Sequence, residues 1–257
     1  MCKKLMAIIA FLFLSTAAAQ AADISELVEK RISADRTTLD LTGLNIGPQD
    51  AKKLAAMESL SSVITLHLQG NRIKARGIKA LARSPHLVNL KHLDLWGNLL
   101  GDRGLKAIVE SPYLKNLVSL KLWKNEISDD SLEFLAKSRN FANLKVLMLN
   151  DNLITPFGAA IIAESENLLQ LTTLNLFRNE VGDDGAIAFS KSAHFPSLES
   201  LFLGENSITD KGAVPLIESQ NFPALKTLDL GKNLLGEPTA LAAFKINRKE
   251  KVRIIYR

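Results

Sequence analysis

The chain has 257 residues with a formal net charge of +5, and hydrophobic residues make up 47% of it. That length accommodates one or two domains, and the mild charge argues against nucleic-acid binding. The single cysteine excludes a scaffold held together by disulfides.

Residues 1–21 have the features of a signal peptide: a basic start, an apolar run over residues 5–14 and a small-residue cleavage motif that ends at Ala21. The run is shorter than the about 20 residues that a membrane-spanning helix needs. We therefore expect cleavage after Ala21, an exported protein that is periplasmic or secreted, and no stable membrane span. An uncleaved membrane anchor is the alternative. No asparagine begins an N-x-S/T glycosylation motif, which favours a bacterial source.

Residues 22–36 predict a short amphipathic helix. Ser25 is a candidate N-cap. Four apolar residues spaced three to four apart share one face, and these are Ile24, Leu27, Val28 and Ile32. Because a repeat array follows, we expect this helix to cover the end of its core.

Residues 37–257 repeat one pattern, L-x-x-L-x-L-x-x-N-x-L, at a fixed interval of 27 residues. The interval and the leucine spacing are typical of leucine-rich repeats. The asparagine of the pattern recurs at Asn71, Asn98, Asn125, Asn152, Asn179, Asn206 and Asn233. An unbroken array predicts one elongated domain of about eight repeats plus a closing strand.

The two ends of the array depart from the pattern. Leu44 occupies the asparagine position of the first repeat, and Pro48 suits the first position of its helix. Val252 and Ile255 still fall on the repeat grid and predict the closing strand. Basic residues surround this strand, at Lys245, Arg248, Lys249, Lys251, Arg253 and Arg257. They would discourage pairing at the sheet edge, and contact with an anionic surface is the alternative.

Each regular unit predicts a short strand, an asparagine turn and a helix. The asparagine amide can bond backbone groups of its own and the neighbouring turn, so we expect a structural ladder. N-cap types follow three residues later, at Ser128, Thr155 and Thr209. The next position holds acids that would face the positive helix end, at Asp102, Asp129, Asp183 and Asp210. A ladder of calcium sites is the alternative for these acids.

Two further positions recur in the helical half of the unit. Six residues after the asparagine, a glycine would let neighbouring helices approach closely. It stands at Gly77, Gly104, Gly158, Gly185 and Gly212, with Ser131 as the exception. Thirteen residues after the asparagine, a serine is expected to bond backbone at the helix end. It stands at Ser84, Ser111, Ser138, Ser165, Ser192 and Ser219.

The strand, asparagine turn, glycine and full helix together resemble the ribonuclease-inhibitor-like class of leucine-rich-repeat proteins. The resemblance covers residues 37–257, although the uniform repeat is slightly shorter than that family's alternating units and lacks their cysteines. It implies an α/β horseshoe with a concave parallel sheet, convex helices and protein binding as the usual function.

Residues between the inward leucines would look out from the concave sheet in rows, because strand side chains alternate between faces. Large apolar side chains collect in these rows, at Trp96, Trp123, Met148, Phe177 and Phe202, and cations border them at Lys121, Lys124 and Arg178. Exposed apolar surface marks interaction sites, and aromatic residues with arginine are typical of binding hot spots. We expect these residues to bind a protein partner. Glycan binding on the same aromatic face and a spacer without a ligand are the alternatives.

An enzyme is not expected. Ser119, His92 and Asp94 could be imagined as nucleophile, base and orienting acid, but an open sheet offers no oxyanion hole or enclosed pocket. Zinc bound by His67, His92 and Asp94 would need a further ligand or a water molecule, and the sequence shows no residues that would orient these ligands. We predict no catalytic residue, no metal and no cofactor.

Overall fold

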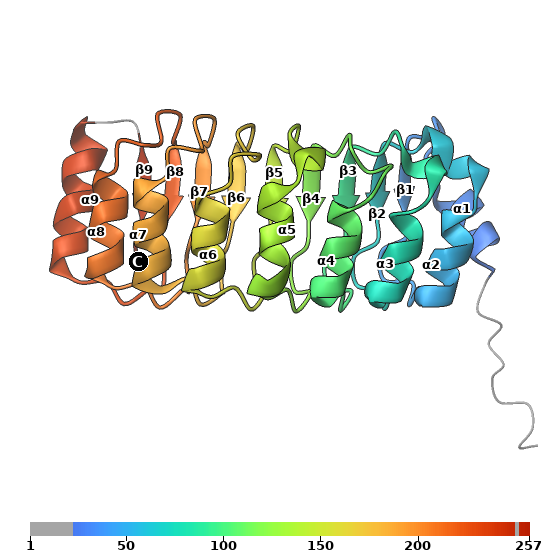
Figure 1. Cartoon of the computed structure of the whole chain (residues 1–257), viewed down its shortest axis with the longest axis horizontal. Helices are drawn as coiled ribbons and strands as arrows, with labels where there is room; N and C mark the ends of the chain where they lie inside the picture. The colour runs from blue at the N-terminus through green and yellow to red at the C-terminus, as the bar shows by residue number, and fades with distance from the viewer. Residues whose placement is uncertain (1–22, 250–251) are drawn as a thin grey trace, which may run out of the picture.

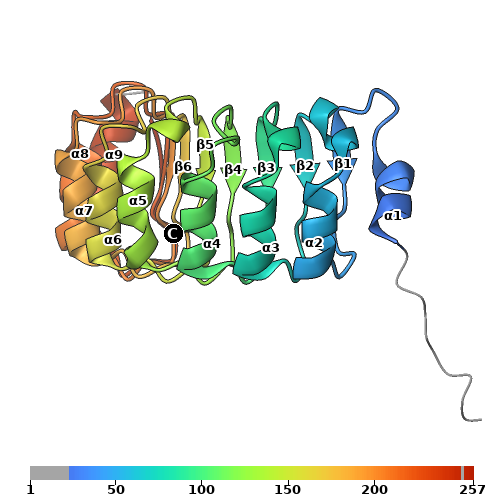
Figure 2. The same cartoon turned by 45° about the vertical axis from the view of Figure 1, so that its right-hand side comes forward.

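The computed structural model describes residues 23–249 and 252–257, so the predicted signal peptide and Lys251 lie outside the described residues. Within them, parallel strands form one open sheet in chain order, with helices on its outer side (Figures 1 and 2). The predicted α/β solenoid is therefore confirmed. The strands are β1 (Thr38–Asp40), β2 (Thr65–His67), β3 (His92–Asp94), β4 (Ser119–Lys121), β5 (Val146–Met148), β6 (Thr173–Asn175), β7 (Ser200–Phe202), β8 (Thr227–Asp229) and β9 (Arg253–Ile255).

Each strand from β1 to β7 leads into a helix that lies beside the helix of the next coil, and β8 leads into the last helix of the described residues (Figure 1). The helices are α1 (Ile24–Arg31), α2 (Pro48–Ala55), α3 (Lys74–Leu81), α4 (Gly101–Val109), α5 (Leu132–Lys137), α6 (Pro156–Ala163), α7 (Gly182–Lys191), α8 (Asp210–Glu218) and α9 (Glu237–Lys249). Short 3-10 helices are η1 (Glu58–Ser62), η2 (Pro85–Leu87), η3 (Asp129–Ser131) and η4 (Arg139–Phe141). No helix of the described residues is both long and apolar enough to cross a bilayer.

Helix α1 packs against β1 and α2 at the start of the array. Its buried residues are Ile24 and Val28, which lie one turn apart on the same face. The N-cap is Asp23, so the prediction of Ser25 was wrong. Burying Ile24 beside Val28 requires Ile24 to be helical, and this moves the helix start ahead of Ser25.

Inward leucines fill the space between sheet and helices, as in the buried residues Leu66, Leu93 and Leu120 on adjacent strands. Strands β1 to β8 pair at the 27-residue interval, but Leu228 pairs with Ile254. Ile254 is buried and Ile255 is half-exposed. The closing strand therefore exists with a register one residue away from the predicted one. A shift of one residue exchanges the two faces of a strand.

The repeated asparagines link each coil to its neighbours. The amide nitrogen of Asn125 donates to the carbonyl of Leu95 in the preceding coil at 2.9 Å. Its carbonyl oxygen accepts from the backbone N–H groups of Asn98 and Leu100 at 3.0 and 3.4 Å. Such bonds satisfy polar backbone groups that the stacked coils bury.

The acids at the helix starts reach across to the next coil. Asp102 accepts from the backbone N–H and the hydroxyl of Ser128, at 2.9 and 2.7 Å, and from the hydroxyl of Ser131 at 2.6 Å. Asp129 and Asp183 bind Thr155 and Thr209 in the same two ways. These aspartates therefore bind the following coil through hydrogen bonds, in addition to any electrostatic interaction with the positive end of their own helix. Thr155 and Thr209 also cap their helices as predicted, whereas the Ser128 hydroxyl makes no cap bond.

Helices start differently where the preceding coil has no acid at this position. The first residue of each of α3, α4 and α7 has a left-handed backbone. Its N–H donates to the backbone carbonyl of the repeated asparagine in the next coil, at 2.8–3.1 Å. These first residues are Lys74, Gly101 and Gly182. The preceding coils carry Pro48, Ala75 and Pro156 in place of the acid. The array thus has two kinds of junction, one linked by a carboxylate and one by a forward backbone bond.

The recurrent glycine and serine positions join the helices of neighbouring coils, the first by close packing and the second by hydrogen bonds. A Cβ on Gly77 would lie 2.7 Å from Ile73 Cγ2 and 3.1 Å from Pro48 Cα, which explains the small residue. Ser131 departs from glycine because its hydroxyl binds Asp102. The recurrent serines donate to helix-end carbonyls of the preceding coil, for example Ser165 to Ala136 at 2.8 Å.

Candidate binding site on the concave sheet

Two tryptophans lie side by side on the concave face. Trp96 and Trp123 follow β3 and β4, and their rings stack with centroids 5.1 Å apart at an interplanar angle of 29°. They remain 38% and 41% exposed. The strands that carry them pair in register, which sets their side chains in one row. The pair forms an exposed aromatic platform, which we call the tryptophan pair.

The orientation of Trp123 is fixed by a hydrogen bond. Its indole Nε1 donates to Asp151 Oδ2 at 3.1 Å. Asp151 Oδ2 also lies 4.0 Å from Arg178 Nη1. Fixing a ring before binding reduces the entropy that a complex must lose.

The other predicted apolar residues are less accessible. Met148, Phe177 and Phe202 are all half-buried. The Phe177 ring lies against the backbone of Gly204, where a Cβ would be 2.8 Å from Phe177 Cδ2. Buried Asn150 stands between Trp123 and Phe177 in the row. The tryptophan pair is therefore the most exposed apolar part of the predicted surface, and the remaining apolar side chains flank it.

A row of left-handed residues runs beside the aromatic residues, at the position directly before each repeated asparagine and before Leu44 of the first repeat. We call it the turn row. The first three members are Gly43, Gly70 and Gly97, and the next five are Lys124, Asp151, Arg178, Glu205 and Lys232, with φ between 52° and 69°. Left-handed backbone is unfavourable for residues with a Cβ, by about 1 kcal/mol or more. The five charged residues adopt this left-handed conformation, whereas glycine could adopt it without strain.

Charges alternate in the second part of the turn row and form ion pairs. Arg178 Nε lies 2.8 Å from Glu205 Oε2, and Lys232 Nζ lies 2.7 Å from Glu205 Oε1. Hydrogen bonds from Lys232 and Arg178 lower the pKa of Glu205, and the bond to Glu205 raises the pKa of Arg178. Among the described residues, Lys124 has no ion-pair partner.

Lys121, the remaining predicted cation, lies 3.6 Å from Asp94. Asp94 also accepts from the backbone N–H of Trp96 at 3.2 Å. Lys121 and Arg178 are therefore already paired, and Lys124 is the one of the three predicted cations that has no ion pair among the described residues.

A shallow hollow of about 220 Å³ lies next to the tryptophan pair, lined by Thr65, His67, His92, Leu93, Asp94, Ser119 and Lys121. It contains the side chains considered for catalysis and zinc. In the described part of the chain, no hydrogen bond joins Ser119, His92 and Asp94 to one another. Nor does any group of three or more His, Cys, Asp or Glu there have a metal-binding arrangement. The hollow thus presents mainly polar side chains, from the strands that precede the two tryptophans.

The turn row was not predicted, although its signal is present in the sequence. Counting one residue back from Leu44 and from each repeated asparagine gives three glycines and then five residues of alternating charge. Glycine at a fixed turn position is a sign of left-handed backbone. Applying that conformation to the charged members would have placed them beside the aromatic rows.

Comparisons with known proteins agree with this architecture. The family model described as "Leucine Rich repeat" matches residues 59–82, 86–109, 170–190 and 195–216. The structure is similar to internalin C2 from Listeria monocytogenes, with a TM-score of 0.58 and 21% identity over 92% of each chain. It also resembles a TDR receptor, with a TM-score of 0.46 and 17% identity, over 90% of this chain and 44% of that one. A comparison with curated proteins found no match. At this identity the internalin likeness concerns the fold alone.

Proposed function

This chain is a leucine-rich-repeat protein, and on that premise we propose that it is a non-catalytic recognition module. We propose that its concave face binds a protein partner, with the tryptophan pair at the centre of the contact. The observation that carries the proposal is the exposure of two stacked indoles on the concave face, where Met148, Phe177 and Phe202 are half-buried.

The free energy available from the tryptophan pair is substantial. A Trp side chain presents up to about 250 Å², so the exposed fractions of 38% and 41% leave roughly 100 Å² on each. Covering that area contributes about 2.5 kcal/mol per ring at 25 cal/mol per Å². This agrees with the about 2 kcal/mol or more that defines a hot spot.

Charge would orient the partner. Lys124 is exposed beside Trp123 and has no ion-pair partner among the described residues. An acidic residue on the partner, next to an apolar or aromatic side chain, would complement both. Met148, Phe177 and Phe202 would extend the apolar contact, and the paired Lys121 and Arg178 would border it.

We also propose export. The signal-peptide features of residues 1–21 support cleavage after Ala21 and a periplasmic or secreted destination. Amino-terminal sequencing of the protein recovered from its native host would test this. A mature chain that still begins at Met1 would contradict it.

Partner capture tests the concave site. The mature chain is immobilised and challenged with envelope and secreted extracts, and each captured protein is quantified for the wild type and two variants. The double variant W96A/W123A should lose the specific partner, by about 30-fold or more in affinity for a hot spot of 2 kcal/mol. The control Phe157→Ala removes a 69% exposed aromatic ring from the convex helix α6 and should capture normally.

One outcome would contradict the proposed site, and another would contradict the proposed protein partner. Capture that survives W96A/W123A unchanged would remove the tryptophan pair from the site. Tryptophan fluorescence that responds to cell-wall glycan fragments, without any captured protein, would favour the glycan alternative.

A further inference from the structure

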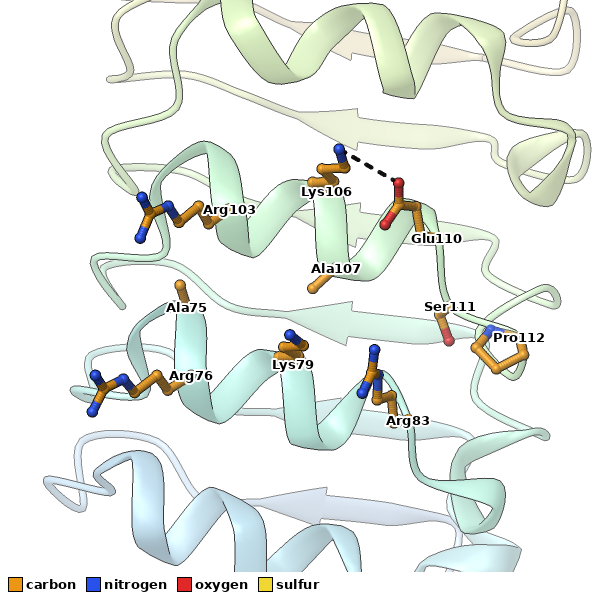
Figure 3. A pocket seen from close by; sticks show the side chains of 10 residues that line it. All are labelled: Ala75, Arg76, Lys79, Arg83, Arg103, Lys106, Ala107, Glu110, Ser111 and Pro112. Atoms are coloured by element: carbon orange, nitrogen blue, oxygen red, sulfur yellow. Dashed lines mark ion pairs between the residues drawn. The ribbon is translucent and has the colours of Figure 1, made fainter.

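A groove on the convex side collects positive charge. It lies between α3 and α4, has a volume of about 470 Å³, and is shown in Figure 3. Its lining residues are Ala75, Arg76, Lys79, Arg83, Arg103, Lys106, Ala107, Glu110, Ser111 and Pro112. Five of these are basic and one is acidic. The groove is separate from the concave sheet and from the function proposed for it.

One of the five cations is already engaged. Lys106 Nζ lies 3.7 Å from Glu110 Oε1, and it lies 3.9 Å from the centroid of the Phe134 ring. Glu110, the acid of the groove, is therefore taken by Lys106. The other four cations have no ion pair among the described residues, and they are Arg76, Lys79, Arg83 and Arg103.

The four unpaired cations surround the groove. Arg76 and Arg103 occupy the same position in adjacent coils and extend toward the same end of their helices (Figure 3). Arg83 extends from the end of α3 toward α4, and Lys79 projects from the middle of α3 (Figure 3). Arg76 and Arg83 are two turns apart on α3, about 10 Å along the axis. One ligand that lies in the groove can thus meet cations from both helices.

The repeat does not impose this charge on every coil. At the position of Arg76 and Arg103, the next three coils carry Asp130, Phe157 and Asp184. At the position of Lys79 and Lys106, they carry Glu133, Ala160 and Ile187. Stacking of coils therefore does not explain why these two neighbouring helices carry cations on both walls of the groove.

We propose that this groove binds a phosphate-bearing group. Four unpaired cations repel one another, and a phosphate monoester relieves this repulsion with a charge of about −1.5 to −2 at neutral pH. Guanidinium groups match phosphate oxygens in a two-pronged geometry. The four unpaired cations are the charged groups that the groove offers to a ligand, because Lys106 already pairs with Glu110. Recognition here depends on the anionic group itself, carried by a lipid headgroup or by a soluble phosphate ester.

Two probes distinguish the sources of phosphate. The mature protein is mixed with vesicles of four parts phosphatidylcholine and one part phosphatidic acid, with pure phosphatidylcholine vesicles as reference, and sedimented. In parallel, glycerol 3-phosphate is titrated into the protein by calorimetry. Sedimentation with the anionic vesicles alone would assign a lipid headgroup, and calorimetric binding alone would assign a soluble ester. Either result supports the proposal.

Matched variants tie the binding to the groove. R76Q/K79Q/R83Q removes three groove cations and should weaken binding by about a hundredfold. The control R139Q/K191Q/K211Q removes three exposed cations on later coils and should change it by less than about threefold. Both triple variants lower the net charge equally, so a difference between them is not a bulk charge effect. Circular dichroism checks that both are folded.

Three results would overturn the proposal. The first is no binding to either probe at low salt. The second is an equal loss in the two triple variants. The third is displacement of the phosphate probe by polyglutamate at equal charge concentration, which would show a site for acidic peptides.

Discussion

Replacing Asn125 with alanine tests how the coils are held together. The side chain is fully buried, and its carbonyl oxygen accepts from the backbone N–H groups of Asn98 and Leu100. Its amide nitrogen donates to the carbonyls of Leu95 and Trp123. Alanine has no polar side-chain atom, so the substitution removes all of these hydrogen bonds.

The loss can be estimated from the groups left without a partner. Leu95 O retains the amide of Asn98 as a donor at 3.0 Å. The N–H groups of Asn98 and Leu100 lie in residues that are 0% and 2% exposed, and no other acceptor for them is present among the described residues. An unsatisfied buried donor costs about 1–3 kcal/mol, so Asn125→Ala should lower the free energy of unfolding by about 4 kcal/mol. That is a large share of the about 5–15 kcal/mol of a typical domain.

Urea unfolding followed by tryptophan fluorescence and circular dichroism measures this loss. Asn116→Ala is the control, because Asn116 also donates to a neighbouring coil, to Val88 O at 2.8 Å, but is exposed. It should change stability by less than about 0.5 kcal/mol. If Asn125→Ala lost no more than Asn116→Ala, the asparagine ladder would not be a source of stability, and the reasoning would be refuted.

Two further predictions concern packing and charge. Gly77→Ala would place a Cβ 2.7 Å from Ile73 Cγ2 and 3.1 Å from Pro48 Cα. Thermal unfolding should therefore show that the free energy of unfolding falls by about 1–3 kcal/mol. An unchanged melting temperature would contradict the close approach of α2 and α3. Lys232 and Arg178 lower the pKa of Glu205, so its contribution is present at neutral pH and is lost as the pH falls through the acidic range toward that lowered pKa. The urea midpoints of the wild type and Glu205→Gln should therefore differ at neutral pH and converge as the pH falls through the acidic range. A difference that is independent of pH would show that the charge of Glu205 is not the cause.

The repeat interval was enough to predict most of the architecture. It places equivalent residues on the same face of successive strands, so Leu66, Leu93 and Leu120 were expected inside and are buried. The start of α2 at Pro48 was also predicted from the fixed φ of proline. A pattern with a constant period says which residues are alike. It does not say with which neighbouring coil a side chain forms its bonds.

The errors follow from that limit. The hydrogen bonds of Asp102 go to the next coil, and this choice depends on the hydroxyls of Ser128 and Ser131. At the C-terminus, the pattern has no asparagine with which to fix the register, and Ile254 takes the core position that was expected for Ile255. Of the site, the rows of aromatic residues could be derived from strand alternation. The degree of burial could not, because it depends on features such as Phe177 lying against Gly204.

The two kinds of junction between coils make the repeats unequal as building blocks. Removing residues 126–152 would shorten the array by one turn and set Asp102 opposite Thr155, whose hydroxyl and N–H can take the place of those of Ser128. Removing residues 153–179 would instead set Asp129 opposite Gly182, which has no hydroxyl and a left-handed backbone. A protein engineer who trims or extends this solenoid would have to transfer each aspartate together with the hydroxyl residue that follows it one turn later.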